Sequence, residues 1–245
     1  MIRSYADLEA LSRAAAELFV QQAQQAVEAR GRFGVVLSGG DTPRRTYEVL
    51  ALHLFRERVP WAEVHVFWGD ERCVPPEDPR SNALMAHETL LDQVPIPAPQ
   101  VHPITCGSAP EEAARRYEDL LRDFFGGQRP CFDLVFLGLG INGHTASLFP
   151  ETPVLEEQDR RVAEVYVAEE GLYRVTLTAS LINDARVVAF LFGGRDKARI
   201  LRQVLEGKRD ISRLPAQSIQ PTEGELLWLV DRSAGSLLSR NERIR

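Results

Sequence analysis

Hydrophobic residues near the N-terminus recur at the spacing of an amphipathic helix. That face consists of Leu8, Leu11, Ala15, Leu18 and Phe19. Ser4 and Asp7 resemble a capping box at its start, with Asp in place of the usual Glu or Gln. Gly31 provides a stop signal. The pattern therefore predicts that the chain opens with a helix capped at Ser4.

Shorter apolar runs follow, and each ends at one or two glycines. They cover residues 33–38, 64–68, 133–137 and 186–192, which are the lengths of buried strands. Helices are expected between them, one from Ser108 to Phe125 and another over residues 196–206. Strands that alternate with helices predict an α/β fold, with a doubly wound, mainly parallel sheet and helices on both faces, as in Rossmann-like proteins.

The remaining segments fit the same organisation. Residues 173–178 indicate another strand, and residues 225–238 a strand followed by a helix. Thr42 is expected to cap the helix after the first glycine turn, with Pro43 in its first turn, where a missing N–H costs nothing. No Gly/Ser linker or repeat interrupts the sequence, so residues 1–245 are expected to form one domain.

Composition narrows the class of protein. The sequence is 44% hydrophobic and 26% charged, as in globular proteins. No apolar run approaches the ~20 residues of a membrane helix, and the N-terminus lacks the pattern of a signal peptide. We therefore expect a cytoplasmic protein without a membrane partner, monomeric by default. The net charge of −6 argues against a nucleic-acid partner, but not against a small anionic substrate, because local basic groups decide that.

The sulfur and imidazole side chains give no framework for a disulfide or a metal. Cys73, Cys106 and Cys131 are widely spaced, odd in number and without a C-x-x-C pair. We expect all three to be reduced thiols. Cys73 has no histidine near it in the sequence, so a structural role is favoured over a nucleophilic one. The histidines show no metal-binding spacing such as H-E-x-x-H.

Polar residues cluster just after the predicted strands, where ligands bind in doubly wound sheets. The first such turn contains Ser38, Gly39, Gly40 and Thr42. Its glycines allow a close backbone approach, and the helix that follows offers unpaired N–H groups to an oxyanion. An ordinary strand-to-helix turn would have the same composition. This turn therefore indicates a phosphate site only in combination with others.

A charged turn follows the second strand. Residues 69–75 contain Asp70, Glu71 and Arg72, and the segment continues to Asp78 and Ser81-Asn82. Charged groups are costly to desolvate at a strand end unless they pair or bind a ligand. The alternative is a solvated turn, the commoner fate of such runs.

A glycine-rich loop follows the third strand. Residues 138–150 contain G-x-G-x-x-G, but Pro150 limits any following helix to about two turns, and no acidic strand end follows at the spacing of a dinucleotide site. Ser147 lacks the G-x-S-x-G pattern of a hydrolase nucleophile. His144 remains as the candidate for proton transfer near neutral pH, although a lone histidine is more often structural.

Two basic residues complete the candidates. Arg174 lies in the strand over residues 173–178, and Lys197 follows the turn at Gly193-Gly194. A cation early in a helix opposes the helix dipole, so Lys197 indicates an anion nearby. For Lys197 taken alone, an ordinary surface lysine is the simpler interpretation.

Taken in order, these segments resemble the 6-phosphogluconolactonase family, within the wider group that includes glucosamine-6-phosphate isomerase/deaminase. The resemblance rests on residues 38–43, 69–75 with Asp78 and Ser81-Asn82, 138–150, 174–178 and 193–197. It covers most of the chain. It implies hydrolysis of 6-phosphoglucono-1,5-lactone to 6-phosphogluconate in the oxidative pentose phosphate pathway, with neither a metal nor an organic cofactor.

The resemblance also implies roles for the residues above. The turn at Gly39, Gly40 and Thr42 would hold the substrate phosphate with Arg174 and Lys197. His144 would take a proton from water as it attacks C1 and return it to the departing ring oxygen. Backbone N–H groups of the glycine loop could stabilise the oxyanion. We expect Asp70 to orient His144, and Arg72 either to bind substrate or to hold its loop through Glu71.

Two features depart from the pattern of related proteins. Asn142 stands where they carry Asp, and in the deaminase branch an acid there takes part in catalysis. Asn142 can bind or orient but cannot act as a base. Residues 146–149 also lack the acid that this branch carries. Both departures favour a lactonase over a glucosamine-6-phosphate isomerase/deaminase. A non-catalytic sugar-phosphate sensor is disfavoured because the sequence has no attached DNA-binding segment.

Overall fold

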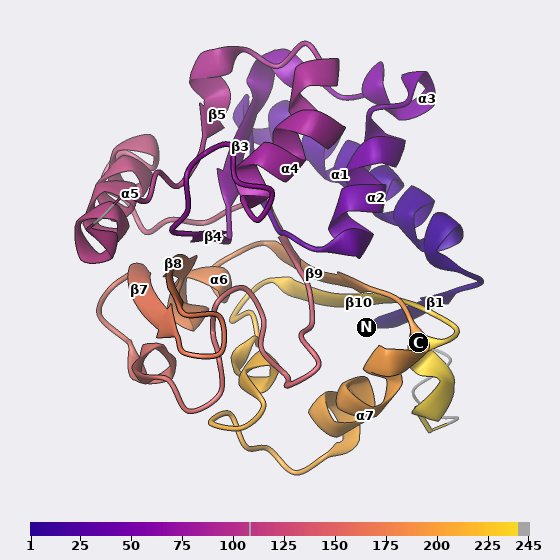
Figure 1. Ribbon diagram of the computed structural model, residues 1–245. Helices are drawn as coiled ribbons and strands as arrows, with labels where there is room; N and C mark the ends of the chain where they lie inside the picture. Colours follow the sequence, from indigo (N-terminus) through magenta and orange to yellow (C-terminus); the bar gives the residue numbers. More distant parts are fainter. Residues whose placement is uncertain (108, 240–245) are drawn as a thin grey trace.

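The computed structural model describes residues 1–107 and 109–239, and a seven-stranded parallel sheet forms its centre (Figure 1). The strand order is β1-β10-β9-β6-β2-β3-β5, and every pair is parallel. The strands are β1 (Ile2–Tyr5), β2 (Phe33–Leu37), β3 (Val64–Trp68), β5 (Val101–His102), β6 (Leu134–Leu137), β9 (Val187–Phe192) and β10 (Glu225–Asp231). The order runs outward from β2 to β5 and from β6 to β10, which confirms the predicted doubly wound sheet.

The helices lie on both faces of this sheet, with α1 and α2 on one side and α7 on the other (Figure 1). They are α1 (Leu8–Arg30), α2 (Asp41–Leu50), α3 (His53–Arg56), α4 (Asn82–Thr89), α5 (Pro110–Phe124), α6 (Ala179–Ile182) and α7 (Ala198–Glu206). Single 3-10 turns occur at Trp61–Glu63, Leu91–Gln93, Ala98–Gln100, Pro153–Glu156, Arg195–Lys197, Pro215–Ser218 and Ala234–Leu237. Across the described residues, none of the helices has the length and apolar character that crossing a membrane requires.

A second, antiparallel sheet of three strands lies beside the first (Figure 1). It has the order β4-β8-β7, with β4 (Asp70–Arg72), β7 (Val162–Val167) and β8 (Leu172–Leu177). The charged turn after β3 is therefore itself a short strand. The predicted strand that contains Arg174 belongs to this small sheet, so Arg174 does not follow the end of a parallel strand.

The predicted apolar face of the first helix is largely confirmed. Leu11, Ala15 and Phe19 are fully buried, and the Phe19 ring meets the Phe33 ring of β2 edge-on, with centroids 5.3 Å apart. All five residues of β2 are buried, as expected for a central strand covered on both faces. Leu8, at 37% exposed, lies at the edge of the helix face.

The N-terminus differs from the prediction. Ser4 lies in the strand β1, and α1 begins later, with Asp7 as its N-cap accepting a hydrogen bond from the Ala10 N–H at 2.8 Å. The edge strand β1 is held by pairing with β10, near the other end of the chain. The hydrophobic pattern of neighbouring residues cannot predict a pairing over that distance. Gly31 ends α1 in the left-handed conformation, at φ 72°, as predicted.

Two smaller boundaries also shift. The helix expected from Ser108 to Phe125 is α5, which begins at Pro110 and ends at Phe124; Ser108 lies outside the described residues. The C-terminal strand is followed by a 3-10 turn, Ala234–Leu237, where a helix was expected.

The prediction of three reduced cysteines is wrong for two of them. Cys73 and Cys106 form a disulfide with their Cα atoms 4.9 Å apart, and only Cys131 is a free thiol. The two partners are 33 residues apart in sequence. They meet because the segment that follows β5 returns to the end of β4, which cysteine spacing does not reveal.

The cap of α1 gives a test of the observed N-terminus. Asp7→Ala is expected to lower the free energy of unfolding by about 1 kcal/mol, because the Ala10 N–H loses its acceptor. Ser4→Ala, at an exposed position of β1, should change it by less than about 0.5 kcal/mol. Urea denaturation of both variants measures the difference, and a larger loss for Ser4→Ala would contradict the assignment.

Candidate active site

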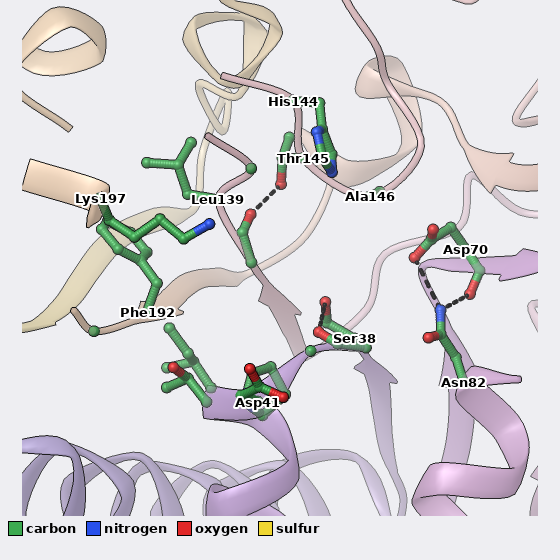
Figure 2. Close-up of a pocket in the computed structure, with 18 of the residues that line it drawn as sticks. Ser38, Asp41, Asp70, Asn82, Leu139, His144, Thr145, Ala146, Phe192 and Lys197 are labelled. Carbon is green, nitrogen blue, oxygen red and sulfur yellow. Dashed lines mark hydrogen bonds between the residues drawn. The ribbon is translucent and has the colours of Figure 1, made fainter. Parts of the chain in front are cut away.

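A pocket of 390 Å³ opens at the carboxyl ends of β2, β3, β6 and β9 (Figure 2). The predicted site residues that line it are Ser38, Gly39, Gly40, Thr42, Asp70, Arg72, His144, Arg174 and Lys197. Lys197 and Asp70 approach it from opposite sides, with Ser38 and Asp41 along another edge (Figure 2). Asn142 does not line the pocket itself but contacts His144, which does.

The turn after β2 brings backbone close to the pocket. A Cβ on Gly39 would lie 2.0 Å from the Asn82 side-chain oxygen, so any larger residue there would displace the Asn82 amide. Gly40 is the N-cap of α2 with φ 104°, a conformation that suits glycine. Thr42 lies inside the helix rather than capping it, which corrects the prediction. The first N–H groups of α2 have no partner within the helix and are available to an anion.

Ser38 is held in place by Tyr47 of α2. The Ser38 N–H donates to the Tyr47 hydroxyl at 2.9 Å, and that hydroxyl donates to the Ser38 carbonyl at 2.9 Å. Tyr47 is fully buried, and burial raises its pKa. The turn is therefore anchored from behind by a neutral phenol.

Asp70 connects three parts of the site. Its side chain is buried, accepts a hydrogen bond from the Ser147 hydroxyl at 2.6 Å, and forms an ion pair with Arg174 at 3.3 Å. The Asn82 amide donates to the Asp70 carbonyl at 2.9 Å. The strand β4 thereby joins the glycine-rich loop, β8 and the start of α4.

Glu71 caps a helix. Its buried carboxylate accepts from the backbone N–H groups of Asn82 and Ala83, both at 2.8 Å, and from the Ser81 hydroxyl at 3.0 Å. Burial raises the pKa of Glu71, against these hydrogen bonds. The carboxylate also accepts from the backbone N–H of Arg72. The Arg72 guanidinium donates to the carbonyl of Arg80 in the next loop.

The glycine-rich loop is a tight turn without a helix. The Gly140 N–H donates to the His144 carbonyl at 2.8 Å, and the Gly143 N–H donates to the Gly140 carbonyl at 3.0 Å. A Cβ on Gly140 would lie 2.1 Å from the His144 ring, so this glycine makes room for the imidazole. Ala146 has φ 47°, a left-handed conformation that is unfavourable for a residue with a side chain.

The His144 ring is oriented by Asn142. Its Nδ1 lies 2.6 Å from the Asn142 side-chain oxygen, which also accepts the His144 backbone N–H at 3.2 Å. Because an amide oxygen only accepts, we assign the proton to Nδ1, which leaves the Nε2 lone pair free. The ring stacks on Phe149 with centroids 4.2 Å apart. Within the described residues Asp70 makes no hydrogen bond to His144, so the expected orienting contact comes from Asn142 instead.

His144 is set up as a neutral imidazole. Burial lowers its pKa to about 4; the Asp70 charge opposes this shift, and the charges of Arg174 and Lys197 add to it. At neutral pH the ring is therefore uncharged and able to accept a proton.

The two basic residues assigned to the phosphate have different surroundings. Arg174 is 4% exposed and pairs with Asp70 and with Glu170. Lys197 precedes α7, and its ammonium lies 4.0 Å from the Asp196 carboxylate, which is largely exposed. Figure 2 shows the Lys197 side chain extending into the pocket. Lys197 is thus the less neutralised of the two cations.

Sequence reasoning missed four residues of the site: Asn82, Ser147, Phe149 and Glu170. The sequence assigns no role to Asn82, although it belongs to the segments that carry the family resemblance, and the pattern around Ser147 bears only on a nucleophile. Ser147 is fully buried against Asp70. Across residues 1–107 and 109–239, no group of three or more His, Cys, Asp or Glu is arranged to hold a metal ion.

Comparisons with known proteins agree with this geometry. The profile of a family described as glucosamine-6-phosphate isomerases/6-phosphogluconolactonase matches residues 6–228. A 6-phosphogluconolactonase from Synechocystis sp. is 45% identical, over 87% of this chain and 88% of that protein. The human 6-phosphogluconolactonase is 36% identical, over 98% and 94%.

Solved structures give the same result. The 6-phosphogluconolactonase from Trypanosoma brucei superposes with a TM-score of 0.83 at 28% identity, covering 98% of both chains. A monomeric glucosamine-6-phosphate deaminase reaches a TM-score of 0.81 at 22% identity, over 97% of this chain and 99% of that one, a likeness of fold alone. The match of the profile over most of the chain, together with these relatives, places the protein in the glucosamine-6-phosphate isomerase/6-phosphogluconolactonase family.

Proposed function

We propose that this protein hydrolyses 6-phospho-D-glucono-1,5-lactone to 6-phosphogluconate, in the oxidative pentose phosphate pathway. The observation that carries the proposal is a partly buried, neutral His144, held by Asn142 with Nε2 free, in a pocket that also contains Lys197 and the start of α2. The pocket's 390 Å³ suits one sugar phosphate. Relatives named 6-phosphogluconolactonase support the choice of substrate.

In the proposed mechanism His144 acts as general base and then as general acid. Nε2 takes a proton from a water molecule as its oxygen attacks the lactone carbonyl carbon, C1. The tetrahedral intermediate then breaks the bond between C1 and the ring oxygen, and Nε2 returns the proton to that oxygen. The lactone carbonyl is already electrophilic, so no covalent nucleophile is needed. Backbone N–H groups of the glycine-rich loop are proposed to stabilise the oxyanion.

The surrounding residues fit these two proton transfers. Asn142 orients the imidazole but does not accept its proton. The proton taken from water therefore stays on His144, which is an imidazolium while the tetrahedral intermediate exists. Asp70 makes no hydrogen bond to the ring among the described residues, but its carboxylate favours the protonated form. We propose that Asp70 stabilises the imidazolium through space and, through Ser147, holds the loop in place.

The phosphate is proposed to bind between the start of α2 and Lys197. The unpaired N–H groups after Gly40 and the weakly neutralised ammonium supply complementary charge. Arg72, a second cation in the lining, is proposed to contact the anionic substrate as well. Arg174 is proposed to position Asp70, because one of its guanidinium nitrogens pairs with Asp70 and another with Glu170.

Two other functions fit less well. A glucosamine-6-phosphate isomerase/deaminase would use an acid where this chain has Asn142, and the structure gives that amide the task of holding His144. A sugar-phosphate sensor would not require His144 to be neutral with a free Nε2. A single domain, a monomer and a cytoplasmic location remain predictions from the sequence.

The histidine is the first test. His144→Ala is expected to lower kcat/KM by about 10²–10⁴-fold, the usual contribution of general acid–base catalysis. The assay follows freshly prepared lactone after subtraction of spontaneous hydrolysis. His53→Ala, at an exposed histidine of α3, serves as control. Near-normal activity of His144→Ala would refute the mechanism, and brisk ammonia release from glucosamine 6-phosphate by the wild-type protein would refute the substrate.

The pH profile tests the role of Asn142. A base works only when neutral, so the wild-type kcat/KM should fall as the pH drops through about 4, the pKa that burial gives His144. Asn142→Asp places a carboxylate on Nδ1 and should raise that pKa, which moves the acid limb to higher pH by at least one unit. NMR of lactone consumption between pH 3 and 8 measures the limb; an unmoved limb would show that Asn142 does not contact the working imidazole.

Lys197 tests the phosphate site. Lys197→Ala is expected to raise KM by tenfold or more, because a charge-assisted contact to phosphate is worth about 1.5–3 kcal/mol, while kcat changes less. Lys208→Ala, an exposed lysine after α7, is the matched control. If Lys197→Ala lowered kcat and left KM unchanged, the lysine would act on the reaction centre rather than on the phosphate.

A further inference from the structure

The Cys73–Cys106 disulfide joins the edge strands of the two sheets. Cys73 directly follows β4, the first strand of the small sheet, and Cys106 lies just past β5, the last strand of the large one. On the Cys73 side the backbone is well held, because β4 pairs with β8 and the Cys73 N–H donates to the Tyr173 carbonyl at 2.9 Å.

On the Cys106 side little else holds the chain. β5 pairs with β3 at only two positions, Val101 and His102. Pro103, Thr105 and Gly107 are exposed, and Ile104 is the one buried residue between β5 and the end of the first described range. Within the described residues, the backbone of residues 103–107 makes no backbone–backbone hydrogen bond. The disulfide is therefore the main tether of this segment.

The tethered segment forms one wall of a second pocket. This pocket has a volume of 280 Å³ and shares Arg72 with the active-site pocket. Its lining includes residues 103–106 together with Glu71, Arg72 and Ser81. Cys106 is half-buried and borders this space, so a thiol in solution has a route to the disulfide.

Other residues of this lining connect directly to the active site. Glu71 accepts the Asn82 backbone N–H, and the Asn82 amide in turn donates to the Asp70 carbonyl and lines the substrate pocket. Arg72 borders both pockets. If the segment that carries Cys106 moved away, the Glu71 carboxylate would lose part of its cover, and with it the support that Glu71 gives to Asn82.

We propose that Cys73–Cys106 is a thiol–disulfide exchange site through which a dithiol reductant weakens substrate binding. A thiolate of the dithiol attacks the Cys106 sulfur, and the S–S bond breaks to release Cys73 as a thiolate, which takes up a proton. The second thiol of the reductant then attacks the mixed disulfide and releases Cys106. Two electrons and two protons end on the protein cysteines, and the dithiol becomes a disulfide.

Reduction of the disulfide is expected to change KM rather than kcat. Asn82 and Arg72 lie on the substrate pocket, whereas His144 is oriented by Asn142 on a separate loop. The expected change in KM rests on the proposed function, but loss of the disulfide and its thermal effect do not.

The test compares oxidised and reduced wild-type protein. Oxidised glutathione and dithiothreitol set the two states, and alkylation with mass spectrometry counts the free thiols. We expect one free thiol, Cys131, in the oxidised form and three in the reduced form. Reduction should lower the thermal unfolding midpoint by several degrees and raise the KM for the lactone by about tenfold, the equivalent of one weakened charge-assisted hydrogen bond, while kcat changes less than twofold.

Variants identify the bond responsible. The double variant Cys73→Ser, Cys106→Ser should show, under oxidising and reducing conditions alike, the higher KM of the reduced wild-type protein. Cys131→Ser should respond to reduction as the wild type does. An oxidised protein with three free thiols would overturn the proposal, as would equal KM values in the two states of an enzyme that turns over the lactone. Absence of turnover in both states would instead count against the proposed function and, with an unchanged unfolding midpoint, against the exchange site too.

Discussion

The site depends on one buried carboxylate. Asp70 is placed by β4 in the small sheet, yet its partners come from the glycine-rich loop and from β8. A buried charge is tolerated only when it is paired and hydrogen-bonded, and the Ser147 hydroxyl, the Arg174 guanidinium and the Asn82 amide meet that requirement. Removing any one partner leaves the charge less compensated, so the three elements are constrained to stay together.

This arrangement separates positioning from reaction. Arg174 and Ser147 are buried and bind Asp70, whereas His144 and Lys197 are only partly buried where they line the pocket. The glycines serve the second group. Gly140 makes room for the imidazole, and Gly40 allows α2 to begin against the pocket. A rigid buried network and an open lining let the site hold its geometry while the substrate enters and leaves.

Much of this could be predicted from the sequence, for local reasons. Short apolar runs that end in glycine specify parallel strands and place their loops at one edge, which gave the pocket and most of its lining. The errors came from long-range pairing. β1, β4 and the disulfide each depend on a partner far away in sequence. Residues 70–72 have the composition of a charged turn and form a strand only because they pair with β8. Asn142 and His144 are two residues apart, so that contact was within reach of sequence reasoning, whereas the pairing of Asp70 with Ser147 was not.

The contact between Gly39 and Asn82 constrains how the sequence can change. Any side chain at position 39 would overlap the amide of residue 82, which itself holds Asp70 and is held by Glu71. A smaller residue at position 82 would make space for a side chain at 39 but would remove the hydrogen bond to Asp70. Neither position can change alone without loss of a contact, and changing both does not restore the hydrogen bond to Asp70. The two residues, 43 positions apart, therefore act as one unit, and a change at either position is expected to weaken the contacts of Asp70 whatever residue stands at the other.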